Sequence, residues 1–500
     1  MFDTLVDDWL IEPKGNALLL SSAEKLHVID TGRGLGPILQ AIGGAERVND
    51  KLFGYFQAID LCSLSICSRA LYALIMADDG LWRDLAIGTL SDSILDARLK
   101  EFNSWIGVVL GRQHAKKKFG RIFSDAVHRP LQCARTVLDP YWLSRDNVSR
   151  EVEKISVDDF VTKYELPKIP VLLKGYSTSF ANGIERWRNG LKDGMTTLNN
   201  KQGRFRCGAR SIQSEAFASY STSGLANLDE SPLYIFDARF AETFPELGKD
   251  YIVPEVFSGE GRDLFEHLGP AKRPDFRWVI AGAPRSGSKW HLDPNCTHAW
   301  NASLLGRKKW IMLPPWGAPP PGVFPSPDGG SVAQPVSLVE WFMEFYKITR
   351  KTRDRDLIEF IADVGDLVFV PSGWWHAVLN IDESFAVTQN YVSTSNLPRA
   401  MRFFEQKTDQ ISGLSRRGGQ CDVDDRRKTF AKEFREAIPK KFADMCNVDI
   451  ASDNSTSAFV AWSALVPKQQ KMDECTQPSA GSGFAFSFNF APEPEDNENE

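Results

Sequence analysis

Between residues 165 and 395, seven short runs rich in β-branched, aromatic and leucine residues follow one another, and turn residues separate them. The runs are IPVLLKG, PLYIFD, FRWVIAGA, KKWIML, DLVFVP, HAVLNI and FAVTQNYV. Short strands repeated in this way are typical of a β-sandwich or barrel. The middle of the chain is therefore expected to form an all-β unit.

One long interruption separates these strands. The proline- and glycine-rich segment from Pro314 to Pro335 is expected to have no regular structure and to lie on the rim of the barrel. A helix is predicted directly after it, because Ser337 and Glu340 have the spacing of a capping box.

The flanks of the β unit have helical patterning, and a chain of 500 residues needs more than one core. Helices are expected over residues 46–90, where Leu61, Leu64, Cys67 and Leu71 form an apolar stripe. The predicted organisation is a lead-in (1–45), a helical module (46–90), a helical connector (91–160), the β unit (161–395), C-terminal helices (396–470) and a disordered acidic tail (471–500).

Composition excludes several classes of protein. A formal net charge of −6 argues against a protein that coats nucleic acid. The chain contains no apolar stretch of about 18 residues, so no membrane-spanning helix is expected. The acidic N-terminus does not resemble a secretory signal. Eight scattered cysteines without a CxxC pair indicate a reducing compartment. The glycines of TGRGLGP lack the Lys-Ser/Thr of a nucleotide loop, so a turn is the better interpretation.

Metal-capable side chains occur in two of the predicted strand regions. His291 and Asp293 stand two residues apart, which places both on one face of a strand. His376 is the candidate for a third ligand. A hairpin centred on Glu383 would set His376 opposite Asn390, so that His376, Thr388 and Asn390 share one face. The alternative is three unrelated polar residues whose hydrogen bonds are satisfied in a core.

A second expected hairpin turns at Gly306-Arg307 and would pair Asn301 with Met312. Asn301 and Lys308 would then point to the same face as Trp310. A lysine there is costly unless it meets an anion, or unless it extends its amine to the surface.

Two histidines and a carboxylate form the facial triad of non-haem Fe(II) oxygenases, which leaves coordination positions open. A co-substrate carboxylate and O₂ can fill these positions. A buried lysine such as Lys308 suits the second carboxylate of 2-oxoglutarate.

Two segments, SGSKWHLDPNCTHAWNASLLGRKKWIMLPP and GDLVFVPSGWWHAVLNIDESFAVTQNYV, closely resemble the jumonji-C (JmjC) oxygenases. They are most similar to the branch of nuclear lysyl-hydroxylases that are also discussed as arginine demethylases. SPLYIFD and RWVIAGAPRSG extend the resemblance, which covers roughly residues 160–395. It implies an α+β protein whose catalytic domain is a double-stranded β-helix (a cupin jelly roll), with Fe(II) held by His291, Asp293 and His376.

The resemblance also implies a co-substrate pocket. Ser288 stands where the family uses a threonine to contact 2-oxoglutarate, and Lys308 would pair with the distal carboxylate. The other residues expected to line this pocket are Asn301, Thr388, Asn390 and Tyr220. Thr388 and Asn390 could instead be ordinary strand residues. Neither His298 nor Cys296 is expected to be a ligand.

The segment LCSLSICSRALYALIMADDGLWRDLA resembles an F-box, although the usual opening Leu-Pro is missing. This resemblance implies binding to the Skp adaptor of a cullin ubiquitin ligase. The alternative is a helical cap on the barrel.

The favoured hypothesis is an Fe(II)-, 2-oxoglutarate- and O₂-dependent protein oxygenase, with lysyl hydroxylation as the first choice. N-methyl demethylation of histone arginine or lysine is the alternative, and a non-enzymatic F-box adaptor is the rival from another class. The family branch and the basic run Lys116–Lys118 indicate a nuclear or nucleocytoplasmic protein, although such a run can also be a solvated helix face.

Overall fold

A computed structural model describes residues 11–12, 29–30, 53–112, 122–176, 204–207, 210–249, 251–414 and 423–447, apart from single positions at 54, 78, 124, 223 and 244. Its contacts divide the chain into two compact units. The first comprises Met1–Leu138 and Trp187–Tyr234, and the second comprises Asp139–Arg186 and Ile235–Glu500. The glycine-rich turn at residues 32–36, the basic run and the acidic tail lie outside the described residues.

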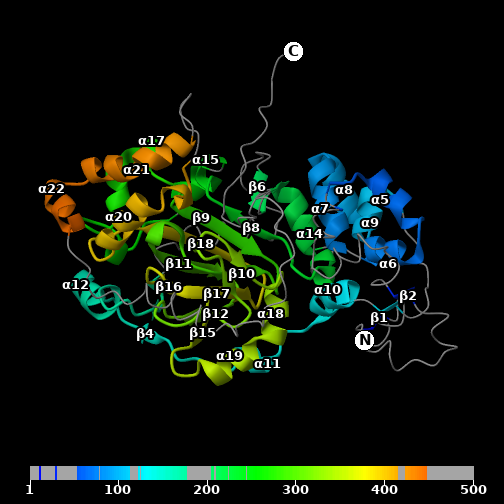
Figure 1. The fold of residues 1–500 in the computed structure, drawn as a ribbon, viewed down its shortest axis with the longest axis horizontal. Coiled ribbons are helices and arrows are strands. Elements are labelled where there is room, and N and C mark those ends of the chain that lie inside the picture. Colours follow the sequence, from blue (N-terminus) through cyan, green and yellow to red (C-terminus); the bar gives the residue numbers. More distant parts are fainter. Residues whose placement is uncertain are drawn as a thin grey trace, which may run out of the picture. The chain divides into compact units, whose positions relative to one another are not determined.

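The first unit is mainly helical (Figure 1). Its helices are α5 (Ala58–Ser65), α6 (Arg69–Ala77), α7 (Asp79–Thr89), α8 (Asp92–Glu101), α9 (Trp105–Leu110), α10 (Asp125–Arg135) and α14 (Ser214–Thr222). Its short strands are β1 (Ile11–Glu12), β2 (Ile29–Asp30), β3 (Ile122–Phe123), β6 (Arg204–Cys207) and β7 (Arg210–Gln213). Trp82 and Trp105 are fully buried between these helices. The helices predicted between residues 53 and 90 are confirmed.

The second unit contains two large sheets. The smaller has the order β10-β17-β12-β15, and the larger has the order β4-β5-β16-β11-β18-β9-β8. The strands are β4 (Ser149–Glu151), β5 (Val171–Leu173), β8 (Tyr234–Asp237), β9 (Arg277–Gly282), β10 (Gly287–His291), β11 (His298–Leu305), β12 (Lys308–Leu313), β15 (Ile358–Ala362), β16 (Leu367–Val370), β17 (Trp375–Asn380) and β18 (Ser384–Tyr391). All seven predicted strand runs are confirmed, and two packed sheets agree with the expected jelly roll.

Both predicted hairpin pairings are wrong. β11 pairs with β16 and β18, whereas β12 pairs with β15 and β17. The chain therefore crosses between sheets at Gly306-Arg307, and it crosses again between β17 and β18. His376 lies opposite His291 and Met312 rather than opposite Asn390.

The hydrophobic core of this unit lies between the two sheets. One buried cluster combines residues of the small sheet with residues of the large one. Its members include Trp310, Met312, Phe360 and Val378 from the small sheet, and Leu172, Ala299, Val368 and Val370 from the large one. Side chains that alternate with these along a strand point away from the core.

The rim segment contains more structure than expected. β13 (Phe324–Pro325) pairs with β14 (Val332–Ala333), so part of Pro314–Pro335 forms a short hairpin. α18 (Leu338–Glu344) and α19 (Tyr346–Thr352) follow. Ser337 is the N-cap, as predicted, and accepts a hydrogen bond from the Glu340 amide at 3.0 Å. The Glu340 carboxylate bonds back to the amide of Val336, also at 3.0 Å.

A helical layer follows the last strand (Figure 1). It consists of α20 (Leu397–Gln406), α21 (Val423–Ala437) and α22 (Lys440–Ala443). Their buried side chains, with Leu264 and Phe265, form a second core that we call the C-terminal core. The shorter helices of the second unit are α11 (Pro140–Leu143), α12 (Val157–Phe160), α15 (Phe240–Thr243), α16 (Pro245–Lys249) and α17 (Gly269–Lys272).

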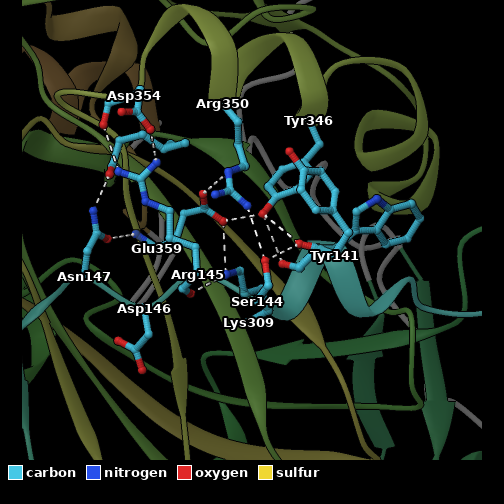
Figure 2. A network of polar contacts seen from close by, with 12 residues as sticks. Tyr141, Ser144, Arg145, Asp146, Asn147, Lys309, Tyr346, Arg350, Asp354 and Glu359 are labelled. Carbon is cyan, nitrogen blue, oxygen red and sulfur yellow. Dashed lines mark hydrogen bonds and ion pairs between the residues drawn. The ribbon is translucent and has the colours of Figure 1, made fainter.

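A buried ion pair lies on the outer face of the small sheet (Figure 2). Lys309 Nζ lies 3.0 Å from Glu359 Oε2, and both side chains are fully buried. Tyr346 donates a hydrogen bond to the same carboxylate oxygen at 2.8 Å, and Lys309 donates one to the Arg145 carbonyl at 3.0 Å. The pair therefore ties α19 and the segment after α11 to the sheet that carries Lys308 on its other face.

Within the described residues, no helix is long and apolar enough to cross a membrane.

Candidate metal centre

The three predicted metal ligands converge. Among the described residues, His291, Asp293 and His376 form the one group of acidic, histidine or cysteine side chains whose ligand atoms could share an ion, and these atoms all lie within 4.8 Å of one another. β10 ends at His291, which lies opposite His376 at the start of β17. Asp293 lies in the loop beyond the strand, so strand alternation does not place it.

Backbone contacts orient both imidazole rings. His291 Nδ1 lies 2.7 Å from the Lys289 carbonyl, and His376 Nδ1 lies 3.0 Å from the Trp374 carbonyl. A carbonyl only accepts, so Nδ1 carries the proton in each ring and Nε2 is left as the ligand atom. This arrangement is typical of histidines that bind a metal.

Both imidazole rings are in the neutral protonation state that binding of a cation requires. Burial lowers the pKa of both His291 and His376 to about 4, so both rings are neutral at pH 7, as metal ligands must be.

Protein groups compensate the carboxylate of Asp293 only in part, through Asn390 at 3.4 Å from Oδ1. Burial raises the pKa of Asp293 to about 6, and its Oδ2 accepts no hydrogen bond. A buried carboxylate oxygen without a partner is costly, and a divalent cation would compensate it. Two neutral imidazoles and one carboxylate fit Fe(II).

Lys308 lies on the interior face of β12. Its side chain is fully buried, and Nζ donates a hydrogen bond to Asn380 Oδ1 at 2.7 Å. Asn380 Nδ2 in turn donates to Ser286 Oγ at 2.9 Å. Burial lowers the pKa of Lys308 to about 7. A buried ammonium next to a neutral amide is ready for an anion, and the alternative of a surface lysine is wrong.

Asn380 was not foreseen from the sequence, although a signal for it existed. It lies four residues after His376 on the same strand and hence on the same face. It is also the direct cross-strand partner of Lys308.

Three other predicted pocket residues line the interior. Asn301 lies opposite Thr388, and Ser288 lies opposite Val378, whose side chain belongs to the interior cluster. Cross-strand partners share a face, so these side chains lie on the same side of their sheets. Asn301 Oδ1 is buried without a hydrogen-bond partner, whereas Thr388 Oγ1 donates to the Trp300 carbonyl at 2.9 Å.

Asn390 lies nearer to the triad than to Lys308. Its Nδ2 donates to Thr297 Oγ1 at 2.9 Å and approaches Asp293 Oδ1 at 3.4 Å. Its contacts therefore indicate that it orients a metal ligand, and a contact with 2-oxoglutarate stays a prediction.

Tyr220 belongs to the first unit and is fully buried there. Its hydroxyl donates to Asp229 Oδ2 at 2.7 Å and accepts from the Leu233 amide at 3.1 Å. Arg83 also reaches Asp229, at 3.3 Å. These contacts commit the hydroxyl to a network inside the first unit, so they lend no support to a place in the co-substrate pocket.

Both ring nitrogens of His298, which was not expected to be a ligand, have protein partners. Its Nδ1 accepts from the Ser372 amide at 2.9 Å, and Nε2 lies 3.0 Å from Ser395 Oγ.

The pKa of Lys308 predicts a pH dependence for the binding of a dicarboxylate. The lysine is charged below pH 7 and loses its charge above it, whereas a carboxylate stays ionised throughout this range. We expect the apparent KM for 2-oxoglutarate to rise by about tenfold per pH unit between pH 7.5 and 9. Steady-state kinetics in a buffer series test this, and the rise should vanish in Lys308→Met. An equal rise in that variant would assign the effect to another group.

Comparison with known proteins agrees with this geometry. A family model for the JmjC domain, described as a hydroxylase, matches residues 278–391. That range contains all three triad residues, Lys308 and Asn380.

Several curated proteins are similar to this chain. Arginine-specific demethylase JMJ22 of Arabidopsis thaliana is 38% identical over 442 residues, which are 86% of this chain and 81% of that protein. The bifunctional arginine demethylase and lysyl-hydroxylase psr-1 of Caenorhabditis briggsae is 39% identical, over 51% of this chain and 64% of that protein. The 2-oxoglutarate and iron-dependent oxygenase JMJD4 of Danio rerio is 27% identical, over 40% of this chain and 46% of that protein. The chain thus spans less than two thirds of the last two.

Proposed function

Since the chain belongs to the JmjC-domain family of Fe(II)- and 2-oxoglutarate-dependent protein oxygenases, we propose that it hydroxylates lysine side chains of protein substrates, with His291, Asp293 and His376 as the iron ligands. The observation that carries the proposal is that the three triad side chains come together, and that the fully buried Lys308 points to the same interior face of the small sheet.

Each of these side chains has a defined task. The Nε2 atoms of the two histidines and the carboxylate of Asp293 would hold Fe(II), while each Nδ1 keeps its proton and donates it in a hydrogen bond to the backbone carbonyl that orients the ring. Lys308 pairs with the distal carboxylate of 2-oxoglutarate, and Asn380 holds its amine in place before binding. Fe(II), 2-oxoglutarate and O₂ together supply the oxidation of a substrate C–H bond and yield succinate and CO₂.

Buried apolar side chains on one side of the site limit the access of water to this chemistry. Trp310 and Met312 are buried beside the triad, and the Trp310 ring stacks on the His376 imidazole with 6.0 Å between centroids. A dry site strengthens each electrostatic contact inside it.

N-methylarginine demethylation is the second candidate. It is supported by the similarity to JMJ22, which extends over 86% of this chain. Both reactions begin with oxidation of a C–H bond, and they differ in the carbon that is attacked. Hydroxylation of lysine retains the new oxygen, whereas an oxidised N-methyl group leaves as formaldehyde.

The experiment that separates the two uses histone-tail peptides with unmodified lysine and with methylated arginine. Peptide mass spectrometry after incubation with Fe(II), 2-oxoglutarate and O₂ should detect the gain of one oxygen atom on lysine. Loss of a methyl group together with release of formaldehyde would establish demethylation instead. Succinate formation without a change in any peptide would contradict both assignments for these substrates.

For the helical module we propose that α5 binds a Skp-type adaptor. The exposed apolar residues differ from the predicted stripe, because Leu61 is fully buried. Ile59 and Ile66 are instead 71% and 82% exposed, and Tyr55 just before α5 is 88% exposed. Clustered exposed apolar side chains support a partner-binding surface.

Charges placed on this surface should abolish adaptor binding and leave catalysis intact. We expect Ile59→Glu/Ile66→Glu to lose a purified Skp protein in a pull-down while 2-oxoglutarate turnover stays within about twofold of wild type. Ile94→Glu on α8 is the control, because Ile94 is also exposed but lies on another helix of the same unit. Undiminished binding by the double variant, or no binding by the wild type, would favour the structural cap.

We also propose a nuclear or nucleocytoplasmic location, supported by the basic run at residues 116–118. Replacing all three lysines with alanine and imaging a fluorescent fusion tests the role of this run, and an unchanged nuclear signal would contradict it.

A further inference from the structure

The loop that carries Asp293 has an uncommon backbone. Asn295 and Cys296 both have left-handed conformations, with φ of 58° and 53°. Two of the four non-glycine residues with positive φ in the described part of the chain therefore stand next to each other here. Such conformations are unfavourable for L-residues and persist where neighbouring groups hold them.

Two sets of hydrogen bonds hold this loop. Asn295 Nδ2 donates to the Ser412 carbonyl at 3.0 Å, and the Ser412 amide donates to Asn295 Oδ1 at 3.0 Å. The Cys296 carbonyl accepts from Ser372 Oγ at 2.7 Å and from Asn396 Nδ2 at 2.9 Å. The carboxamide of Asn295 thus pairs with one backbone position through both of its polar groups.

The segment that Asn295 contacts is itself firmly held. Arg427 on α21 donates to the Ile411 carbonyl at 2.9 Å, and the Asp275 amide donates to the Gly413 carbonyl at 2.8 Å. Ile411 is fully buried in the C-terminal core, and the side chain of Cys296 packs against the same core. The C-terminal region therefore contacts the loop that carries Asp293 through Asn295 and Cys296.

We propose that Asn295 is a positioning residue for the metal ligand Asp293, and that the C-terminal helices brace the metal centre through the Asn295–Ser412 pair. Without the pair, the loop would relax from its left-handed conformation and the carboxylate of Asp293 would move away from the two imidazoles. This inference rests on the proposed iron ligands, and it adds a function for a region outside the range matched by the family model.

The test measures metal binding directly. Co(II) is titrated into the full-length protein without O₂ and followed by its visible absorption, and thermal unfolding is recorded in parallel. Asn295→Gly keeps the left-handed backbone accessible and removes the carboxamide. We expect it to weaken Co(II) binding by about tenfold or more, as is typical for groups that orient a metal ligand.

Asn147→Gly is the matched control. Asn147 makes the same reciprocal pair with a backbone segment, since Nδ2 donates to the Leu357 carbonyl at 2.9 Å and Oδ1 accepts from the Glu359 amide at 2.7 Å. It lies in the network on the outer face of the small sheet (Figure 2). Its loss should lower thermal stability and leave Co(II) affinity within about twofold of wild type.

The outcomes separate this proposal from the assignment of the ligands. Unchanged Co(II) affinity in Asn295→Gly, or equal losses in Asn295→Gly and Asn147→Gly, would overturn the positioning role. Co(II) binding retained by His291→Ala in the same titration would instead overturn the triad. If Asn295→Gly does not fold, Asn295→Asp keeps one of the two hydrogen bonds. A smaller loss of Co(II) affinity is then expected, and wild-type affinity overturns the proposal.

Discussion

Replacing His291 with alanine should abolish both metal binding and 2-oxoglutarate turnover. Three side chains of the protein would hold the ion in the proposed site, and two of them alone could not compete with water for Fe(II). Asp293→Ala should have the same effect, because it removes the single negative charge of the set. The measurements are iron content after reconstitution and succinate formation with Fe(II) in excess.

The control for this prediction is His267→Ala, because His267 lies outside the triad on an exposed part of the same unit. It should bind iron at wild-type stoichiometry. Iron retained at that stoichiometry by His291→Ala would remove His291 from the ligand set. Circular dichroism shows whether a variant has lost iron because it is unfolded. The spectrum of His291→Ala should be native, because the large core between the sheets does not involve His291.

The faces of the strands could be predicted from the sequence, whereas their partners could not. His376 and Thr388 were expected to share one face, as were Asn301 and Lys308, and these side chains do lie on the interior faces of their sheets. Alternation is a local property of each strand, so it survives an error in pairing. Pairing depends on where the chain crosses to the other sheet, and short turns do not encode this.

The turn at Gly306 illustrates the difference. Its φ of 69° fits the glycine-first turn that the sequence predicts, and yet the strands on either side of it belong to different sheets. The constraint comes from another part of the chain, since a Cβ on Gly306 would lie 2.1 Å from the Glu383 carbonyl oxygen. Arg307 and Asp382 then join the two turns with an ion pair at 2.7 Å. Contacts between residues more than seventy positions apart cannot be inferred from either turn alone.

The candidate site divides in the same way. The triad and Lys308 could be predicted because chemistry restricts the residue types that bind a metal or a carboxylate. Asn295 could not, because an asparagine that holds a loop is indistinguishable in sequence from one in an ordinary turn. The sequence also did not predict that Asp293 would follow the strand rather than belong to it.

The adjacent lysines of β12 give the second prediction with a large effect. Both Lys308 and Lys309 are fully buried, but they point to opposite faces of the small sheet. Lys308 meets the neutral amide of Asn380, whereas Lys309 meets the carboxylate of Glu359. The same substitution by methionine should therefore have opposite consequences at the two positions.

Lys308→Met should raise the KM for 2-oxoglutarate by about tenfold to hundredfold, because a hydrogen bond to a charged group contributes about 1.5–3 kcal/mol. Iron affinity should not change, since Lys308 is not among the ligand atoms. The unliganded variant should unfold at the same temperature as the wild type or at a higher one. A lysine whose pKa is lowered to about 7 by burial destabilises the fold at every pH below its unfolded value, and methionine removes that penalty.

Lys309→Met should do the reverse and lower the free energy of unfolding by about 3 kcal/mol, because it leaves the buried carboxylate of Glu359 without its closest cation. Arg350 is 3.8 Å from that carboxylate and compensates only in part (Figure 2). The KM for 2-oxoglutarate should stay within about twofold of wild type at a temperature where the variant is folded. Urea unfolding measures the stability of both variants, and steady-state kinetics measure their KM for 2-oxoglutarate. If both variants lose stability and 2-oxoglutarate affinity together, Lys308 acts through the fold, and its assignment to the co-substrate carboxylate is wrong.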